Sequence, residues 1–450
     1  MPLHHRGQIF RKAADLISTT YRPYMNAVTM LGTAKTAWQA EIDSAAEQCD
    51  FLRLNTKFAE EIYAEQPPLH SPGTWNRMTY RGLEGFVAAI SPFNFCAIGT
   101  NLNMAPAIMG NTTVWKPSNT AALENYVAFN ILREAGLPDG VINFLPCGPS
   151  VFEHAVLHPS LAGLHFTGST RVFSHLWKVI GSNISNYATY PRIVGETGGK
   201  NFHLIHPSAD LDSAVNQTIR AAFEYQGQKC SACSRVYVPK SLWAEFKEQV
   251  VEGVRSITMG QPDEFEHFMS AVIDEGALLK HTRYLDASKA DPACEILIGG
   301  HTDMSRGYFL QPTVIWAHDP RALTMREEVF GPVLTVTVYD DNKPGFWEEV
   351  LALVDSTSPY GLTGAVFARD RYVIAQAERV LRNACGNLYF NDKSTGAVPG
   401  QQAFGGARAS GTNDKAGSHL NLIRWTSVQA VKENNTYLTD YRYPYMSSEK

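Results

Sequence analysis

The sequence predicts an α/β protein made of two blocks, and two observations lead to this prediction. Short apolar runs with the length of buried strands alternate with amphipathic helical stretches, which is the pattern of a parallel sheet with helices on both faces. The chain has 450 residues, enough for two or three domains, and a glycine-rich turn at 195–199 separates the two blocks. Because ligands in such folds often bind between domains, we expect a site near this turn.

The first block begins with helical periodicity from residue 8 to residue 65, which ends at a Pro-Pro breaker. Residues 67–76 have the composition of a loop, and a short strand is expected at 78–81. The rest of this block alternates between the two kinds of element. Buried strands are expected at 85–90, 112–115, 141–145 and 161–166, and helices at 102–109 and 121–135.

The second block shows the same alternation after the glycine-rich turn. Helices are expected at 211–225, 242–255 and 271–289, and strands at 235–238, near 296 and 333, at 365–367 and at 386–390. The tail from Thr426 to Tyr445 is polar and aromatic, so we expect an arm that pairs with another element or subunit.

Composition excludes several classes of function. The net charge of -5 gives no electrostatic case for binding nucleic acid. No apolar run approaches the ~18 residues of a membrane span, and seven scattered cysteines indicate free thiols in a reducing compartment. The amino terminus has neither an apolar signal region nor an Arg- and Ser-rich leader, so no secretory or import signal is expected.

Two stretches of the first block suggest a nucleotide site. The run from Leu164 to Arg171 reads as a strand, a Gly-Ser turn and a helix start, where free backbone N–H groups can bind phosphate. Roughly half or more of such turns merely connect a strand to a helix, and the G-x-G-x-x-G fingerprint is absent. Lys116 and Ser118 follow a strand, where Lys116 can reach ribose hydroxyls; the alternative is a surface loop lysine.

Two further stretches offer a base and a nucleophile. Glu196 lies in the glycine-rich turn, where a carboxylate can move and where burial can bring its pKa toward the working pH. Its alternative is a solvated loop glutamate, the default for this residue type. Cys230 follows a helix that ends at Gly227, and it precedes a strand. A buried structural cysteine is the alternative there.

The spacing of Cys230 and Cys233 permits two other interpretations. A thioredoxin-like redox pair normally opens a helix, whereas here a helix precedes the motif. A zinc site needs a second pair of ligands, and Cys294 and Cys385 are isolated while no His pair has ligand spacing. Both interpretations stay open as alternatives, although short motifs often match by accident.

Six motifs occur in one order over nearly the whole chain: Pro92-Phe93-Asn94-Phe95, Lys116-Pro117-Ser118, Phe166-Thr167-Gly168-Ser169, Glu196-x-Gly198-Gly199-Lys200, Gly227-Gln228-x-Cys230 and Glu327-Glu328-Val329-Phe330-Gly331-Pro332-Val333. In this order they resemble the aldehyde dehydrogenase superfamily. Longer runs at 80–95, 227–235 and 391–415 are similar to the branch that oxidises L-glutamate γ-semialdehyde, or delta-1-pyrroline-5-carboxylate, to L-glutamate in proline catabolism.

The resemblance implies a Rossmann-type cofactor domain at 1–197, an α/β catalytic domain at 198–395 and a return to the cofactor domain at 396–450. It also implies a small oligomerisation arm, with strands at 67–83 and in the tail, and hence a homodimer or higher homo-oligomer. The same resemblance implies NAD as cofactor, an aldehyde as substrate, no metal, and the mitochondrial matrix as location.

Site residues are implied by the same resemblance, position by position. The catalytic residues are Cys230 as nucleophile, Glu196 as base and Asn94 as oxyanion donor. The dinucleotide would be held by Ser91, Lys116, Gly168, Ser169, Thr170, Arg171, Val172, Glu328 and Phe330. The substrate would be held by Ser231, Gly396 and Ala397 at its α-carboxylate and amino group, and by Phe95 and Phe404 along its aliphatic part.

These residue types suit the implied reaction. A thiolate adds to a carbonyl, and the resulting thiohemiacetal can release hydride to a nicotinamide. The oxyanion needs fixed donors, here the Asn94 amide and the Cys230 backbone N–H, each typically worth ~3 kcal/mol. The thioester that remains needs water activated by a base, which Glu196 can supply.

Three departures from the family leave alternatives open. An additional amino-terminal stretch that members usually carry is missing here, which fits a short isoform, an incomplete chain or a shortened paralogue. Asn119 stands where many relatives have an acid that meets the adenosine ribose, so NAD over NADP rests on the family alone. Ala397 replaces the Ser of some relatives. Another small aldehyde substrate and a non-catalytic paralogue therefore remain alternatives.

Overall fold

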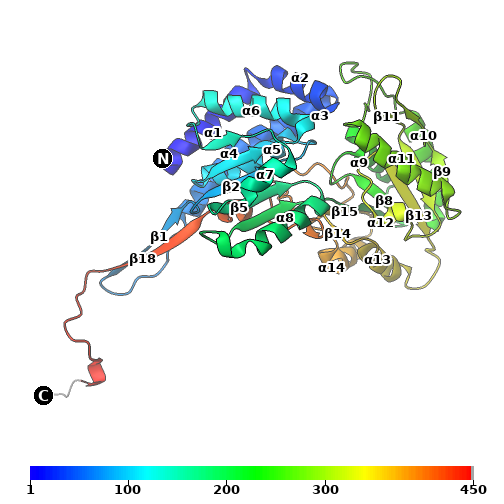
Figure 1. Ribbon diagram of the computed structural model, residues 1–450. Helices are drawn as coiled ribbons and strands as arrows, with labels where there is room; N and C mark the ends of the chain where they lie inside the picture. Colours follow the sequence, from blue (N-terminus) through cyan, green and yellow to red (C-terminus); the bar gives the residue numbers. More distant parts are fainter. Residues whose placement is uncertain (447–450) are drawn as a thin grey trace.

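The computed structural model describes residues 1–446, which form two sheets flanked by helices and a projecting arm (Figure 1). The first sheet is parallel, with the order β4-β3-β2-β5-β6. Counted along the chain from β2, this order is third, second, first, fourth, fifth, which is the doubly wound arrangement of nucleotide-binding folds. The strands are β2 (Phe86–Ile90), β3 (Thr112–Lys116), β4 (Ile142–Phe144), β5 (Leu161–Thr167) and β6 (Arg192–Glu196).

Helices cover this sheet because its central strands are buried on both faces. Every residue of β5 is buried, as expected for a strand between two helical layers. The covering helices are α5 (Cys96–Ile108), α6 (Ala122–Ala135), α7 (Pro149–Val156) and α8 (Thr170–Ser182). An outer layer packs on α5 and α6, formed by α1 (Leu3–Ser18), α2 (Arg22–Thr33) and α4 (Glu47–Ala64).

The second sheet has seven strands in the order β16-β15-β7-β8-β13-β12-β9, parallel except for β9 at one edge. Its strands are β7 (Asn201–Ile205), β8 (Cys233–Pro239), β9 (Cys294–Ile298), β12 (Thr313–Ala317), β13 (Val333–Tyr339), β15 (Thr363–Phe367) and β16 (Asn387–Phe390). Alternate residues of β8 point to opposite faces: Val236 and Val238 pack with one cluster and Tyr237 with another. The predicted α/β class is confirmed.

Helices cover both faces of the second sheet as well. One face packs against α9 (Leu211–Phe223) and α10 (Trp243–Arg255). The other face packs against α13 (Phe346–Ser356) and α14 (Arg371–Val380). A further helix, α11 (Glu275–Ala290), packs beside the edge strand β9.

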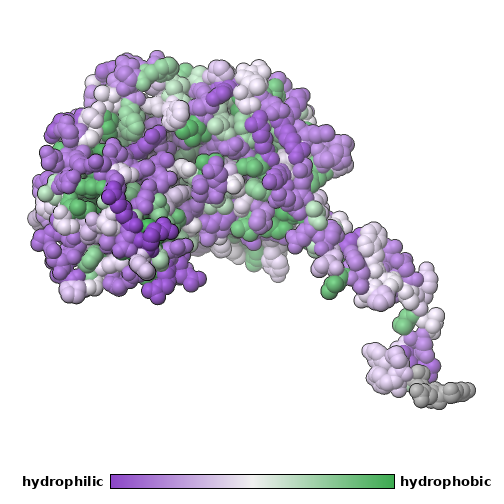
Figure 2. Space-filling view, turned by 180° about the vertical axis from the view of Figure 1, so that it is seen from behind, coloured by the Kyte–Doolittle hydropathy of each residue, from purple (hydrophilic) through white to green (hydrophobic). Residues whose placement is uncertain are grey.

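The arm is a two-stranded antiparallel ribbon of β1 (Thr74–Arg81) and β18 (Ser427–Asn434), followed by a tail that extends away from the rest (Figures 1 and 2). The segment predicted at 67–83 is therefore a single strand; residues 67–73 form none, because Pro67, Pro68 and Pro72 deny it backbone donors. The strand expected at 78–81 already begins at Thr74.

Several predicted boundaries were wrong. The helix expected at 102–109 begins at Cys96, the helix expected at 211–225 ends at Phe223, and the helix expected at 271–289 begins at Glu275. The helical stretch at 8–65 is several helices joined by turns, one of them a π-helical turn at Glu41–Ala46. No helix within residues 1–446 combines the length and the apolarity needed to span a membrane.

Candidate active site

The chain crosses from the first sheet to the second between Glu196, at the end of β6, and Asn201, at the start of β7. The loops after β2 and β5 lie at the topological switch point of the first sheet, where such folds bind ligands. Cys230 lies in the connection from α9 to β8 and lines two cavities. A group bound to this sulfur would therefore be reachable from both cavities.

An unusual turn positions Cys230. Tyr225, Gln226 and Gly227 have successive φ values of 53°, 54° and 64°, and left-handed non-glycine residues cost about 1–3 kcal/mol each. A Cβ at Gly227 would lie 2.4 Å from the carbonyl oxygen of Gly331, so only glycine fits. The Gln226 side chain holds the turn, since its Nε2 donates to the carbonyl oxygens of Ala34 at 3.1 Å and Ala271 at 2.8 Å.

The backbone of Cys230 is fixed from β7. The Asn201 Nδ2 donates to the carbonyl oxygens of Cys230 at 2.7 Å and Ala232 at 2.8 Å. A Cβ at Gly199 would lie 2.3 Å from the Cys230 carbonyl oxygen, which explains the last glycine of the glycine-rich turn. Asn201, which the sequence analysis did not single out, thus holds the backbone on both sides of Ser231.

The Cys230 thiol is protonated at neutral pH in this state. Burial raises its pKa to about 12, and the carboxylates of Glu196 and Glu328 act in the same direction. Because the thiolate is the nucleophilic form, a proton acceptor must act when an aldehyde arrives.

Glu196 is the nearby acceptor. Gly406 N donates to its Oε2 at 3.1 Å and more weakly to its Oε1 at 3.4 Å. Burial raises the pKa of Glu196 well above its usual value, while the Gly406 N–H and Lys415 oppose this effect. A carboxyl with a raised pKa is suited to general-base work near neutral pH.

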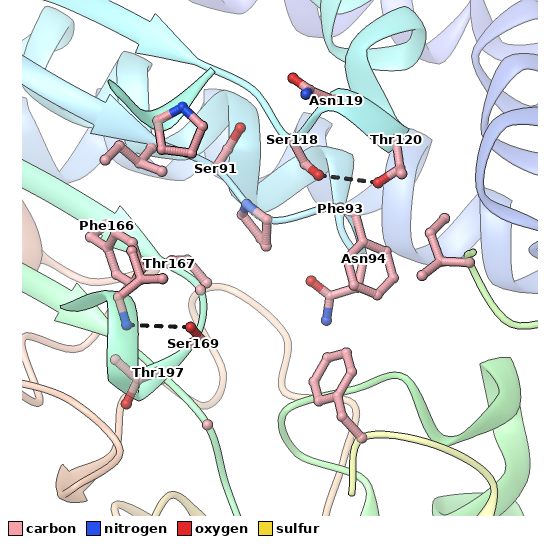
Figure 3. A pocket seen from close by; sticks show the side chains of 18 of the residues that line it. Ser91, Phe93, Asn94, Ser118, Asn119, Thr120, Phe166, Thr167, Ser169 and Thr197 are labelled. Atoms are coloured by element: carbon pink, nitrogen blue, oxygen red, sulfur yellow. Dashed lines mark hydrogen bonds between the residues drawn. The ribbon is translucent and has the colours of Figure 1, made fainter. Parts of the chain in front are cut away.

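Asn94 follows β2 and is buried, with 4% of its surface exposed. Its Nδ2 donates to the Gln228 carbonyl oxygen at 3.0 Å, which leaves the second N–H of the amide for another acceptor. Figure 3 shows the amide beside Phe93, below Ser118 and across the open space from Ser169. A free N–H directed at an acceptor is what the predicted oxyanion role of Asn94 requires.

The larger cavity has a volume of about 750 Å³, within the range of ligand pockets. Residues of both blocks line it, and Figure 3 labels those between Ser91 and Thr197. The sequence-predicted cofactor residues that line it are Ser91, Lys116, Gly168, Ser169, Val172, Glu328 and Phe330. Thr170 and Arg171 do not: the Thr170 hydroxyl donates to Ala409 O at 3.3 Å, and Arg171 is exposed.

This cavity fits a dinucleotide. The Ser169 Oγ accepts from Val172 N at 3.4 Å and begins helix α8, whose first N–H groups suit phosphate. Glu328 Oε1 accepts from Gly199 N at 2.8 Å, and a Cβ at Gly198 would lie 2.3 Å from its Oε2. The glycine therefore leaves room for an acidic side chain that can accept ribose hydroxyls. Lys280, which the sequence did not single out, also lines this cavity.

The smaller cavity has a volume of about 250 Å³. All five sequence-predicted substrate residues line it: Phe95, Ser231, Gly396, Ala397 and Phe404. The Ser231 hydroxyl lies 2.7 Å from that of Thr395, a lining residue that the sequence analysis missed. Glu196 and Lys229 line the same cavity, so a small polar aldehyde would meet charged groups as well as two aromatic rings.

The two cysteines of the Cys-x-x-Cys motif have different surroundings. Both are free thiols; Cys230 keeps some exposed surface, whereas Cys233 is buried with its Sγ 3.7 Å from Arg235 O. Within residues 1–446 there is no group of three His, Cys, Asp or Glu side chains arranged to hold a metal ion.

Known proteins match the whole chain. The model of the aldehyde dehydrogenase family matches residues 1–431. The mitochondrial delta-1-pyrroline-5-carboxylate dehydrogenase of Dictyostelium discoideum is 56% identical over 449 residues, covering 99% of this chain and 80% of that protein. The human enzyme of that name is 52% identical over 447 residues, with 99% and 79% covered.

Solved structures agree. The Delta-pyrroline-5-carboxylate dehydrogenase from Mycobacterium tuberculosis, bound with NAD, superposes with a TM-score of 0.95 at 46% identity, covering 100% of this chain and 82% of that one. The Thermus 1-pyrroline-5-carboxylate dehydrogenase with bound NAD gives a TM-score of 0.90 at 32% identity, covering 96% and 82%. The predicted family resemblance is confirmed, and the chain belongs to the aldehyde dehydrogenase family.

Proposed function

We propose that this chain oxidises L-glutamate γ-semialdehyde, the open form of delta-1-pyrroline-5-carboxylate, to L-glutamate with NAD. The observation that carries this proposal is the position of Cys230, which lines the dinucleotide-sized cavity and the small cavity together. Relatives with the corresponding name are 52% and 56% identical over 99% of the chain.

The first half of the reaction takes place at Cys230. Its sulfur adds to the aldehyde carbon as the thiol proton passes to the Glu196 carboxylate and on to solvent, and the carbonyl oxygen becomes an oxyanion that the Asn94 amide and the Cys230 N–H stabilise. NAD bound in the larger cavity supplies the hydride acceptor. Lys116, Glu328 and the start of α8 would hold that cofactor. Once the thiohemiacetal carbon has given up its hydride, a thioester would remain on Cys230.

The second half requires Glu196. Its carboxylate removes a proton from a water that attacks the thioester, and the carbon–sulfur bond breaks to release the carboxylate product and restore the thiol. Ser231, Gly396 and Ala397 hold the charged end of the substrate, and Phe95 and Phe404 flank its aliphatic part. Because Ala397 has no hydroxyl group, binding of the substrate carboxylate depends more on Ser231 and on the backbone.

The test is NADH formation with L-glutamate γ-semialdehyde and NAD, followed by absorbance. We expect Cys230→Ala to abolish the rate and Cys233→Ser to retain it. Of these two cysteines, Cys230 lines both cavities and Cys233 lines neither. Loss of activity in Cys233→Ser would favour a dithiol mechanism. Turnover of other small aldehydes but not of the semialdehyde would overturn the substrate assignment, and a folded protein inactive toward all of them would favour a non-catalytic paralogue.

We also propose a homodimer or higher homo-oligomer located in the mitochondrial matrix. The arm supports assembly because its tail exposes Tyr437, Tyr441 and Tyr443 with no core beneath them. The matrix location rests on relatives that are named mitochondrial. Light scattering of the purified chain measures the oligomeric state, and fractionation of cells that express it measures the location.

A further inference from the structure

A segment far along the chain closes around the general base. Phe404 and Ala416 form an antiparallel pair, with N–H to O distances of 2.9 Å and 2.8 Å, and so close the loop between them. The same loop is tied to the end of β6: Thr412 N donates to Gly195 O, and Thr197 N donates to Ser410 O, both at 2.9 Å. The backbone on either side of Glu196 is therefore held by residues 404–416.

One peptide unit of this loop links Glu196 to a lysine. The Gly406 N–H donates to Glu196 Oε2 at 3.1 Å, and the carbonyl oxygen of the same peptide, that of Gly405, accepts from Lys415 Nζ at 3.1 Å. The lysine also donates to Gly386 O at 2.7 Å, which fixes its position. A cation at the carbonyl end polarises the peptide and makes its N–H a stronger donor to the carboxylate.

The local backbone is shaped for this contact. A Cβ at Gly386 would lie 1.8 Å from the Gly405 carbonyl oxygen, so a side chain there would displace the peptide unit. A Cβ at Gly405 would lie 3.1 Å from Glu196 Oε1. Asn413 and Lys415 adopt left-handed φ values of 57° and 52°, a strain that persists only where surrounding contacts impose it.

The charges that face Glu196 oppose one another. Lys415 favours the ionised carboxylate, whereas Asp414 disfavours it. Asp414 accepts from the Thr412 hydroxyl and lies 3.2 Å from Arg424 Nε, so it is itself held in place. Neighbouring residues of one loop thus act on the same base in opposite directions.

We propose that Lys415 is a positioning residue, which holds the Glu196 carboxylate in its resting place through the Gly405–Gly406 peptide, while Asp414 balances its charge. This inference rests on the proposed role of Glu196 as the base that activates water. Lys415 and Asp414 act on Glu196 through the loop and through their charges, and neither forms or breaks a covalent bond in the reaction.

The test uses p-nitrophenyl acetate, an activated ester that acylates the thiol without the dinucleotide, so that steady-state turnover reports hydrolysis of the acyl thioester by Glu196. In Lys415→Met the acid limb of the pH profile moves to higher pH by about 1 unit, because a nearby cation has been lost. In Asp414→Asn it moves to lower pH, and in Lys415→Arg it stays near the wild-type position. Limbs that do not move, or that move the same way in Lys415→Met and Asp414→Asn, would overturn the proposal.

A second measurement applies even where the ester is not hydrolysed. Infrared difference spectra against Glu196→Gln isolate the carboxyl band of Glu196, and its titration in each variant gives the pKa directly. Opposite shifts in the two variants support the proposal, and equal or absent shifts overturn it. Failure of this proposal can be told from failure of the proposed function. If the protein oxidises the semialdehyde but the pKa of Glu196 does not move in the variants, only the role of Lys415 is wrong. If the pKa shifts in opposite directions but the semialdehyde is not oxidised, only the substrate assignment is wrong.

Discussion

At the scale of single residues, the site rests on two buried acids, one of which suppresses the ionisation of the other. Burial raises the pKa of both Cys230 and Glu196, and the Glu196 carboxylate raises the pKa of Cys230 further. A resting thiol that is protonated resists adventitious oxidation and alkylation, while a base held beside it by Gly406 N can accept its proton when substrate is bound.

Glu196→Gln should abolish turnover yet make the thiol more reactive. Removing the negative charge lowers the pKa of Cys230, so the thiolate fraction at pH 8 rises and alkylation by iodoacetamide speeds up by roughly threefold to tenfold. Peptide mass spectrometry without cofactor measures the rate at Cys230 alone. Glu124→Gln, which removes a carboxylate from the α2–α6 contact instead, serves as the matched control and should leave that rate unchanged. A slower alkylation in Glu196→Gln would contradict the electrostatic account.

At the scale of elements, the sequence predicted those with a strong local pattern. The strands at 86–90 and 161–167 were placed within one residue at each end, because uniformly apolar runs bounded by turns indicate buried parallel strands. β12 (Thr313–Ala317) and α14 (Arg371–Val380) were missed, and only Ile374 and Ala377 of the second are buried. Tertiary contacts determine the secondary structure of both segments.

The candidate site was predicted where motifs sit at strand ends, and missed where partners are distant in sequence. Glu196 and Cys230 each lie in a glycine-containing turn with a motif of its own. Lys415, by contrast, is brought to Glu196 only by the loop that Phe404 and Ala416 close. No periodic pattern in the sequence predicts such a contact, because the contact depends on backbone carbonyls and on glycines that leave room for them.

The contact between α2 and α6 contains a carboxyl that makes stability depend on pH. Glu124 is 1% exposed, and burial raises its pKa to about 7, against the weaker opposing effects of Lys35 and Thr29. Because the folded-state pKa lies above the unfolded value, this group destabilises the fold progressively as pH rises from about 4.5 to 7. Glu124→Gln, which stays neutral, should therefore stabilise the protein by about 3 kcal/mol at pH 8 and by less than about 1 kcal/mol at pH 5.

Urea unfolding of both proteins at the two pH values measures this difference. Glu327→Gln is a suitable control, since Glu327 is exposed and should show no such pH-dependent gain. An equal effect of Glu124→Gln at pH 5 and pH 8 would mean that packing, and not ionisation, decides the contribution of this side chain.

At the scale of the whole molecule, the larger cavity joins the two sheets. Ser91 and Lys116 reach it from the first sheet, whereas Lys280, Glu328 and Phe330 reach it from the second block. A ligand that spans this cavity contacts both halves and so stabilises their arrangement. The loop at 404–416 joins the halves again, by pairing with the end of β6 while its Lys415 holds Gly386, which precedes β16.

NAD should therefore raise the unfolding temperature of the entire molecule in a single transition. At 100 times its dissociation constant, a ligand that binds only the folded state contributes about 2.7 kcal/mol, or roughly 3 °C for a chain of this size. Glu328→Gln should reduce the shift, because the charged acceptor beside Gly199 N is lost, whereas Glu327→Gln should retain it, because that neighbouring side chain is exposed. Differential scanning calorimetry with and without NAD decides the matter. If two transitions appear and only one responds, the dinucleotide binds to one half alone and the cavity does not couple the two sheets.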